Sequence, residues 1–76
     1  MTKEQKVKLA EESQDPKILQ ELVGDGEQWV RGNVARNLNA SRGTLKKLAS
    51  DGDWWVRRRA NDTLKQKTLK RKHKKR

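Results

Sequence analysis

The chain has 76 residues, of which 39% are charged and 30% are hydrophobic, and its formal net charge is +10. This length allows one small domain with a thin core, and the absence of cysteine excludes disulfides and thiolate metal sites. No apolar run approaches the roughly 20 residues of a membrane span, and no secretory signature opens the chain, so we expect a soluble, cytoplasmic protein.

The excess charge is confined to the C-terminal part of the sequence. Residues 1–56 hold nine Lys or Arg and nine Asp or Glu, whereas residues 57–76 hold eleven Lys or Arg and a single acid, Asp62. A block of this kind repels itself when unpaired and attracts polyanions. The sequence therefore predicts a helical domain over 1–64, nearly all of it charge-balanced, followed by a basic tail, helical or disordered, over 65–76.

The first half of the chain predicts two short helices. Thr2 and Gln5 form a capping-box pattern, which would open a helix with Val7 and Ala10 on one side. Asp15 followed by Pro16 is a cap and first-turn pair for the next helix. The apolar positions of that helix are Ile18, Leu19, Leu22 and Val23, and the residues expected to end it are Gly24 and Gly26.

A third helix is predicted over 27–37, with Val30, Val34 and Leu38 facing inward, and a turn is predicted over 39–41. Ser41 is placed to cap a fourth helix. The apolar positions of the fourth helix are Leu45, Leu48 and Ala49, and the residues expected to open the last helix are Gly52 and Asp53. No alternating strand pattern is present, so the predicted fold class is all-α with about five helices.

An internal repeat relates two parts of the chain. The segment LVGDGEQWVRGNVARNL (22–38) aligns with LASDGDWWVRRRANDTL (48–64) at an offset of 26 residues, with seven of 17 positions identical. The identical pairs are Leu22/Leu48, Asp25/Asp51, Gly26/Gly52, Trp29/Trp55, Val30/Val56, Arg31/Arg57 and Leu38/Leu64. Repeats of this length are typical of helical solenoids. We therefore predict repeat units over about 15–40 and 41–64, with a degenerate unit over 1–14.

The stretches LASDGDWWVR and VARNLNAS carry a resemblance to a known family. They are similar to the L-A-x-D-x-D-W-x-V-R and V-A-x-N-P-x-T-P patterns of the leucine-rich repeat variant family, a HEAT-like helical solenoid. The resemblance covers about residues 15–64 and departs from the pattern at Leu38, Ala40, Ser41 and Arg59 to Asp62. It implies a short solenoid of about two and a half units. The cysteines that hold a cluster in one branch of the family are absent, so no cofactor is implied.

Residues shared by the two units are predicted to be framework. We expect the equivalent Trp29 and Trp55 each to pack between successive helices. In solenoids of this kind, arginines such as the equivalent Arg31 and Arg57 often pair with an aspartate of the same or the next unit. The available partners are Asp25 and Asp51.

Residues that differ between the units point to function. Trp54, Arg58 and Arg59 stand where the first unit has Gln28, Gly32 and Asn33. With Val56, Ala60 and Leu64 facing inward, the opposite face of the last helix carries Trp54, Arg58, Asn61, Lys65, Leu69 and Lys72. Beyond Leu64 the inward side itself becomes basic, at Lys67 and Arg71. Because unpaired ammonium groups are too costly to bury, this helix must extend beyond its domain or fray.

This pattern predicts a nucleic-acid-binding module with weak sequence preference, acting on RNA or DNA. Lys and Arg attract phosphates without reading sequence, and Trp54 could stack on an unpaired base. The predicted binding residues are Trp54, Arg58, Arg59, Lys65, Lys67, Lys70, Arg71, Lys72, Lys74, Lys75 and Arg76.

Other functions stay open. Helical solenoids commonly bind proteins, so the alternative is an adaptor for an acidic protein or a ribonucleoprotein such as a ribosome. A stack of so few units could also self-associate. An anionic membrane surface is less favoured, because Leu69 is alone as an apolar residue beyond Leu64. The single histidine, His73, lies in a charge run without a nearby acid, so we expect neither an enzyme nor a metal site.

Overall fold

The computed structural model describes the backbone of residues 1–74 and the side chains through residue 68. Its helices are α1 (Lys3–Glu12), α2 (Pro16–Leu22), α3 (Gln28–Arg36), α4 (Arg42–Leu48) and α5 (Trp54–Lys74). No strand occurs within residues 1–74. The prediction of an all-α fold with about five helices is therefore confirmed, and the predicted helix starts lie within one or two residues of the observed ones.

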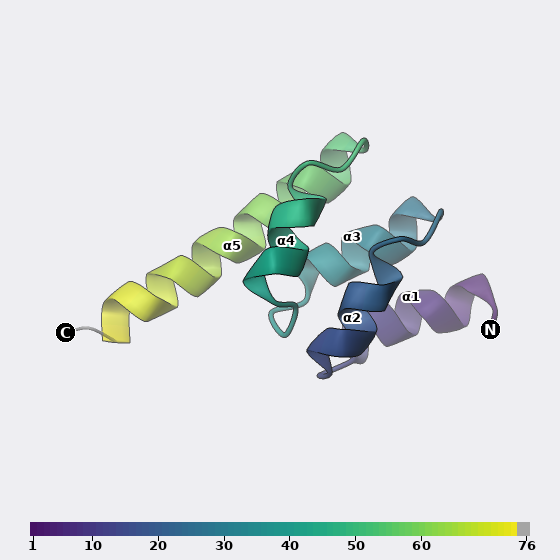
Figure 1. The fold of residues 1–76 in the computed structure, drawn as a ribbon, viewed down its shortest axis with the longest axis horizontal. Coiled ribbons are helices and arrows are strands. Elements are labelled where there is room, and N and C mark those ends of the chain that lie inside the picture. The colour runs from purple at the N-terminus through teal and green to yellow at the C-terminus, as the bar shows by residue number, and fades with distance from the viewer. Residues whose placement is uncertain (75–76) are drawn as a thin grey trace.

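The helices form a row with a partial second layer. Helices α1, α3 and α5 lie side by side, with α3 packed between the other two, and α2 and α4 lie on one side of that row (Figure 1). Helix α4 packs mainly on α5, and α2 packs on α1 and α3. The molecule measures 44 × 24 × 15 Å along its principal axes. Much of its length comes from α5, whose C-terminal half runs past the other helices (Figure 1).

Side chains cap the short helices at the predicted positions. The Oγ1 of Thr2 accepts a 3.2 Å hydrogen bond from the backbone N–H of Gln5, and the Oε1 of Gln5 accepts a 2.9 Å bond from the N–H of Thr2. Asp15 and Ser41 accept backbone N–H bonds in the first turns of α2 and α4. These bonds satisfy donors that have no partner within the helix, so they define where each helix begins.

The core is small and made of short side chains. Its members are Ala10, Leu19, Val30, Val34, Ala35, Ala40, Leu45, Leu48, Val56 and Ala60. Alanines let helices approach closely but bury little apolar area each. The prediction that Leu38 faces inward is wrong, because α3 ends at Arg36 and leaves Leu38 44% exposed in the turn that follows.

Two buried polar side chains tie each helix of the row to the one before it. The Nδ2 of Asn37 donates to the carbonyls of Ala10 (3.0 Å) and Ser13 (2.9 Å) at the end of α1. The hydroxyl of Thr63, at the equivalent repeat position, donates to the carbonyl of Ala35 in α3. Both bonds satisfy backbone carbonyls that packing would otherwise leave unpaired.

Ion pairs form a second recurring link. Lys6 on α1 donates to the carboxylate of Asp25 at 2.9 Å, and Arg31 on α3 donates to that of Asp51 through Nε (2.7 Å) and Nη2 (3.1 Å). The expected pairing of Arg31 is confirmed. The same expectation is wrong for Arg57, which instead donates from Nη1 to the backbone carbonyl of Asp51 at 2.7 Å.

The two equivalent tryptophans differ in environment. Trp55 packs on α3 at Gly32, where a β-carbon would overlap its ring. Trp29 is 49% exposed and meets the ring of Trp55 edge-on at 5.3 Å, so the prediction that it packs between helices is wrong. Gly32 follows Arg31, the cation of the ion pair in α3. In α1 the residue that follows the cation Lys6 is Val7, which packs against the core and is not a glycine.

Candidate nucleic-acid interface

The exposed side of α5 carries a mixed basic and aromatic surface, which we call the outer stripe. Its described members are Trp54, Arg58, Asn61 and Lys65, all exposed, with Trp54 at 65%. They lie opposite the buried Val56 and Ala60 on the helical wheel. The row of helices ends at α5, and no described helix covers this side (Figure 1). The structure therefore brings the predicted stripe residues together on one accessible surface.

The stripe is lengthened because α5 does not turn where α3 does. The chain leaves the helix after Arg36 and turns through 38–40, whereas the equivalent residues 64–66 lie inside α5. Predicted binding residues that lie on the backbone of this extension are Lys65, Lys67, Lys70, Arg71, Lys72 and Lys74. Lys67 is half-buried. The side chains from 69 onward, and the predicted residues Lys75 and Arg76, lie outside the described part of the structure.

The positive charge of the outer stripe is not neutralised within the described side chains. The three ion pairs among them use Lys3, Lys6 and Arg31, none of which lies on α5. Arg58 and Lys65 have no carboxylate within 4.0 Å among these residues. An uncompensated cationic surface of this kind raises the local concentration of polyanions.

Arg59 lies on a different side of α5 from Arg58. Its guanidinium sits 5.9 Å from the ring centroid of Trp55, a cation–π contact with a framework residue. It also lines an open groove of about 450 Å³ between the end of α3 and α5. The groove residues are Arg36, Leu38, Arg59, Asp62, Thr63, Lys65 and Gln66. Lys65 connects this groove to the outer stripe.

Sequence reasoning missed two basic residues near these surfaces. Arg36 ends α3 and enters the groove only because α3 and α5 cross there, so no local signal marks it. Arg57 was assigned to the framework by its repeat position alone. In the structure it differs from Arg31, because among the described residues it bonds to a backbone carbonyl and to no carboxylate.

The charged groups with altered pKa lie in the framework, away from the stripe. Hydrogen bonds from Lys6 and from the backbone N–H of Glu27 lower the pKa of Asp25. Burial opposes ionisation of Asp51, but hydrogen bonds from Arg31 and a backbone N–H outweigh it, so the pKa of Asp51 is also lowered. The hydrogen bond with Asp51 raises the pKa of Arg31 against its desolvation. These groups are ionised at neutral pH and stabilise the fold as ion pairs.

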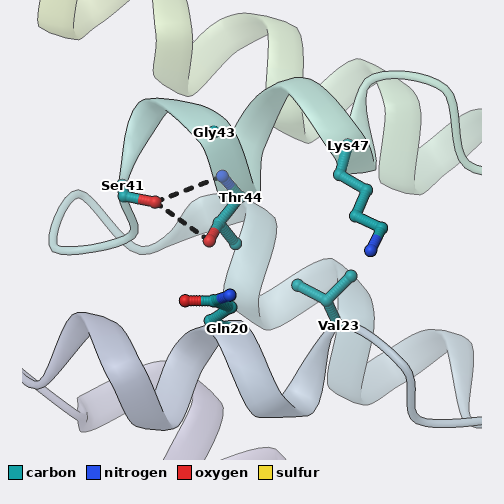
Figure 2. A pocket seen from close by; sticks show the side chains of 6 residues that line it. All are labelled: Gln20, Val23, Ser41, Gly43, Thr44 and Lys47. Atoms are coloured by element: carbon teal, nitrogen blue, oxygen red, sulfur yellow. Dashed lines mark hydrogen bonds between the residues drawn. The ribbon is translucent and has the colours of Figure 1, made fainter.

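A second cavity, of about 160 Å³, lies between α2 and α4. It is lined by Gln20, Val23, Ser41, Gly43, Thr44 and Lys47 (Figure 2). The hydroxyl of Ser41 is occupied in capping α4, through bonds of 3.2 Å and 3.0 Å with the N–H and hydroxyl of Thr44. Lys47 is the one ionisable group in the lining, so the cavity holds no acid–base pair.

Within the described residues, no group of three or more His, Cys, Asp or Glu is placed to hold a metal ion, and no helix is long and apolar enough to cross a membrane. Comparisons with protein-family models, with curated proteins and with solved structures found no match for this chain.

Proposed function

We propose that the protein is a small nucleic-acid-binding module that holds phosphates along α5 with weak sequence preference. The observation that supports this most directly is the outer stripe, where Arg58 and Lys65 are exposed without a carboxylate partner among the described side chains. Lys and Arg bind phosphates of any sequence by releasing condensed counterions. The planar fork of arginine adds directed hydrogen bonds to phosphate oxygens.

The aromatic residue of the stripe suits unpaired bases. Trp54 is 65% exposed and lies one helical turn from Arg58, so an indole face and a guanidinium are adjacent on the same surface. Stacking of a base on an aromatic side chain contributes about 1–3 kcal/mol and tolerates any base. The combination supports binding of single strands as well as duplexes, through phosphate contacts supplemented by stacking.

We also propose that the helices form a short HEAT-like solenoid of the leucine-rich repeat variant kind, over residues 1–64, with 65–76 as its basic extension. Contacts that recur at the repeat offset support this. Arg31 and Arg57 bond to the carbonyls of Asp25 and Asp51, each six residues earlier in the chain. Asn37 and Thr63 each bond to a carbonyl of the preceding helix in the row.

A protein-interaction adaptor is the alternative, and one observation favours it. The uncovered side of α5 corresponds to the side of α3 on which α5 packs, so it is the place where a further helix could dock. Arg58 argues against such docking. It stands at the position of Gly32, where even a β-carbon would overlap the docked Trp55. A partner helix could not repeat that packing, whereas a phosphate needs no such close approach.

The proposal can be tested by fluorescence anisotropy with labelled single-stranded and duplex DNA and RNA at several salt concentrations. The test variant combines Arg58→Glu with Lys65→Glu, and the control combines Lys46→Glu with Lys47→Glu on α4, which are also exposed. Both variants change the net charge equally. We expect the stripe variant to lose much more affinity, with helical circular dichroism unchanged in both. Equal losses of affinity in the two variants would show that binding depends on net charge alone, which would contradict a defined interface on α5.

A complementary measurement separates the two functions. If the protein is purified from its native cells, nuclease treatment should remove bound material that absorbs at 260 nm. A partner protein that stays bound after nuclease and moderate salt would instead support the adaptor function.

A further inference from the structure

A recurring contact links successive helices of the row. The first acidic residue after each helix of the second layer reaches a cation on the preceding helix of the row. Asp25 receives Lys6 at 2.9 Å, and Asp51 receives the Nε and Nη2 of Arg31 at 2.7 Å and 3.1 Å. The second of these is a two-point contact between a guanidinium edge and a carboxylate, which is a strong and directional geometry.

Arg31 and Arg57 also share a hydrogen bond to the backbone. In both residues Nη1 donates to the carbonyl six residues earlier, that of Asp25 at 2.9 Å and that of Asp51 at 2.7 Å. The same nitrogen is used at the same sequence separation, in the first turn of equivalent helices. The guanidinium of Arg57 is therefore anchored on α5 through the same nitrogen that anchors Arg31 on α3, which leaves its Nε and Nη2 edge for another partner.

The partner of that edge differs between the two residues. For Arg31 the edge meets the carboxylate of Asp51. For Arg57 the next position in the row is the uncovered side of α5, and no described residue accepts a bond from its Nε or Nη2. Arg57 is half-buried, with the exposed Arg58 beside it. The result is an oriented guanidinium edge with one nitrogen already bonded to the protein.

We propose that the Nε and Nη2 edge of Arg57 is a preformed site for a two-oxygen anion, and that it takes a phosphate of the nucleic acid. This assignment rests on the proposed function. A carboxylate fits the same edge, as Asp51 shows at Arg31. The phosphate is favoured because Arg58 prevents a further helix from docking as α5 docks on α3, and because the neighbouring stripe is cationic.

Preorganisation gives Arg57 an advantage over Arg58, the arginine of the outer stripe. An exposed arginine must lose side-chain freedom to hold a phosphate. The bond to the carbonyl of Asp51 has already restricted Arg57 in the unbound protein. Arg57 should therefore set the position of one phosphate, while Arg58 and Lys65 supply attraction that is less directional.

The direct test is ¹⁵N NMR of the arginine Nε–H groups in the full chain. Arg31 is an internal reference, because its Nε–H is already bonded to Asp51 and should be protected from solvent exchange without ligand. On addition of a short oligothymidylate, the Nε–H of Arg57 should shift and gain protection, and those of Arg58 and Arg59 should change less. If the oligonucleotide binds and the Nε–H of Arg57 stays unchanged, this assignment is wrong while the proposed function stands. If the oligonucleotide does not bind at all, both the Arg57 assignment and the proposed function are wrong.

A parallel titration with polyglutamate distinguishes the two anions. If polyglutamate moves the Arg57 signal and the oligonucleotide does not, the edge serves a protein carboxylate and the phosphate assignment is overturned.

A charge-conserving variant gives an independent readout. Arg57→Lys keeps one donor for the carbonyl of Asp51 and the positive charge, but it removes the two-nitrogen edge. We expect it to weaken oligonucleotide binding about tenfold, since losing a hydrogen bond to a charged group is worth at least that factor. Arg58→Lys should change binding far less, because its contacts are mainly coulombic. Thermal unfolding of both variants checks that the fold is retained. Equal effects of the two substitutions would contradict the assignment.

Discussion

The indole of Trp55 occupies the space in which a side chain at Gly32 would begin. A β-carbon built at this position would overlap the ring carbons of Trp55, so α3 and α5 meet at a point that only glycine permits. Gly32 is buried in the middle of α3, where glycine is otherwise a poor choice. The close approach of the two helices, and with it the position of α5, depends on this pair.

The first prediction is that Gly32→Ala destabilises the protein. The added methyl must displace the Trp55 ring, and overpacking of this kind typically costs about 1–3 kcal/mol. Gly43→Ala in α4 is the matched control, since its β-carbon would meet nothing closer than the Ser41 hydroxyl at 4.0 Å. That control should stabilise slightly, by about 0.5 kcal/mol or less, because Gly43 lies in the first turn of α4, where the better helix propensity of alanine counts for less than in a helix interior. Urea denaturation measures the free energy of unfolding of both variants, and we expect the two changes relative to the parent to have opposite signs.

The second prediction separates the adjacent tryptophans. Trp55→Ala should destabilise by about 3 kcal/mol, because a large aromatic packed on Gly32 and Trp29 is lost. Trp54→Ala should leave stability nearly unchanged, because this side chain is 65% exposed. For binding of single-stranded oligonucleotides, Trp54→Ala should lose affinity even though the variant remains fully folded. A large loss of stability in Trp54→Ala would show that Trp54 belongs to the core and not to the outer stripe.

Local signals in the sequence predicted the helices well. Thr2, Asp15 and Ser41 cap helices where their patterns indicated, because a cap depends on residues within one turn. The prediction for Leu38 was wrong because its spacing from Val34 fits a helix, but α3 ends at Arg36, before Leu38 is reached. Periodicity alone does not show where a helix ends.

Contacts between distant residues were predicted only in outline. The family resemblance left Asp25 and Asp51 open as partners of Arg31, and the structure shows the pair with Asp51. The same partners were expected for Arg57, which bonds instead to the backbone carbonyl of Asp51. The surroundings of Trp29 and Asn37 could not be predicted from the repeat. Trp29 is 49% exposed although its repeat equivalent Trp55 packs on α3 at Gly32, and the bonds of Asn37 reach residues 24 to 27 positions away.

The outer stripe was predictable because it lies on a single helix. A helical wheel places Trp54, Arg58 and Lys65 on one side without knowledge of the rest of the fold. The groove that contains Arg36 and Arg59 required the crossing of α3 and α5, and the oriented edge of Arg57 required two hydrogen bonds to be compared across the repeat.

The third prediction concerns pH. The pKa values of Asp25 and Asp51 lie below their ordinary value of 3.8. Their unfolded forms therefore take up protons at a higher pH than the folded ones. The stability that they contribute is complete above about pH 3.8 and is lost as the pH falls through the lowered values. Thermal unfolding recorded from neutral to acidic pH should show this loss.

A variant assigns the acid sensitivity to one pair. Arg31→Gln leaves the nearly buried carboxylate of Asp51 without its charged partner, so it should destabilise the protein most at neutral pH. The difference in Tm between this variant and the parent should narrow as the pH falls, because a protonated Asp51 no longer needs the guanidinium. A difference that stays constant with pH would show that Arg31 acts through packing and not through the ion pair.

The fourth prediction concerns the dependence of binding on salt. If about six to eight cationic side chains meet phosphates of duplex DNA, the slope of log K against log salt is about −5 to −7. Removing residues 65–76 deletes eight of the eleven Lys and Arg residues of the C-terminal block and leaves Arg57, Arg58 and Arg59. The slope should then become about −3 or shallower, with weaker binding. The fold should survive, because every buried residue among the described ones lies at Thr63 or earlier. A slope unchanged by the deletion would show that the extension of α5 does not contact the phosphates.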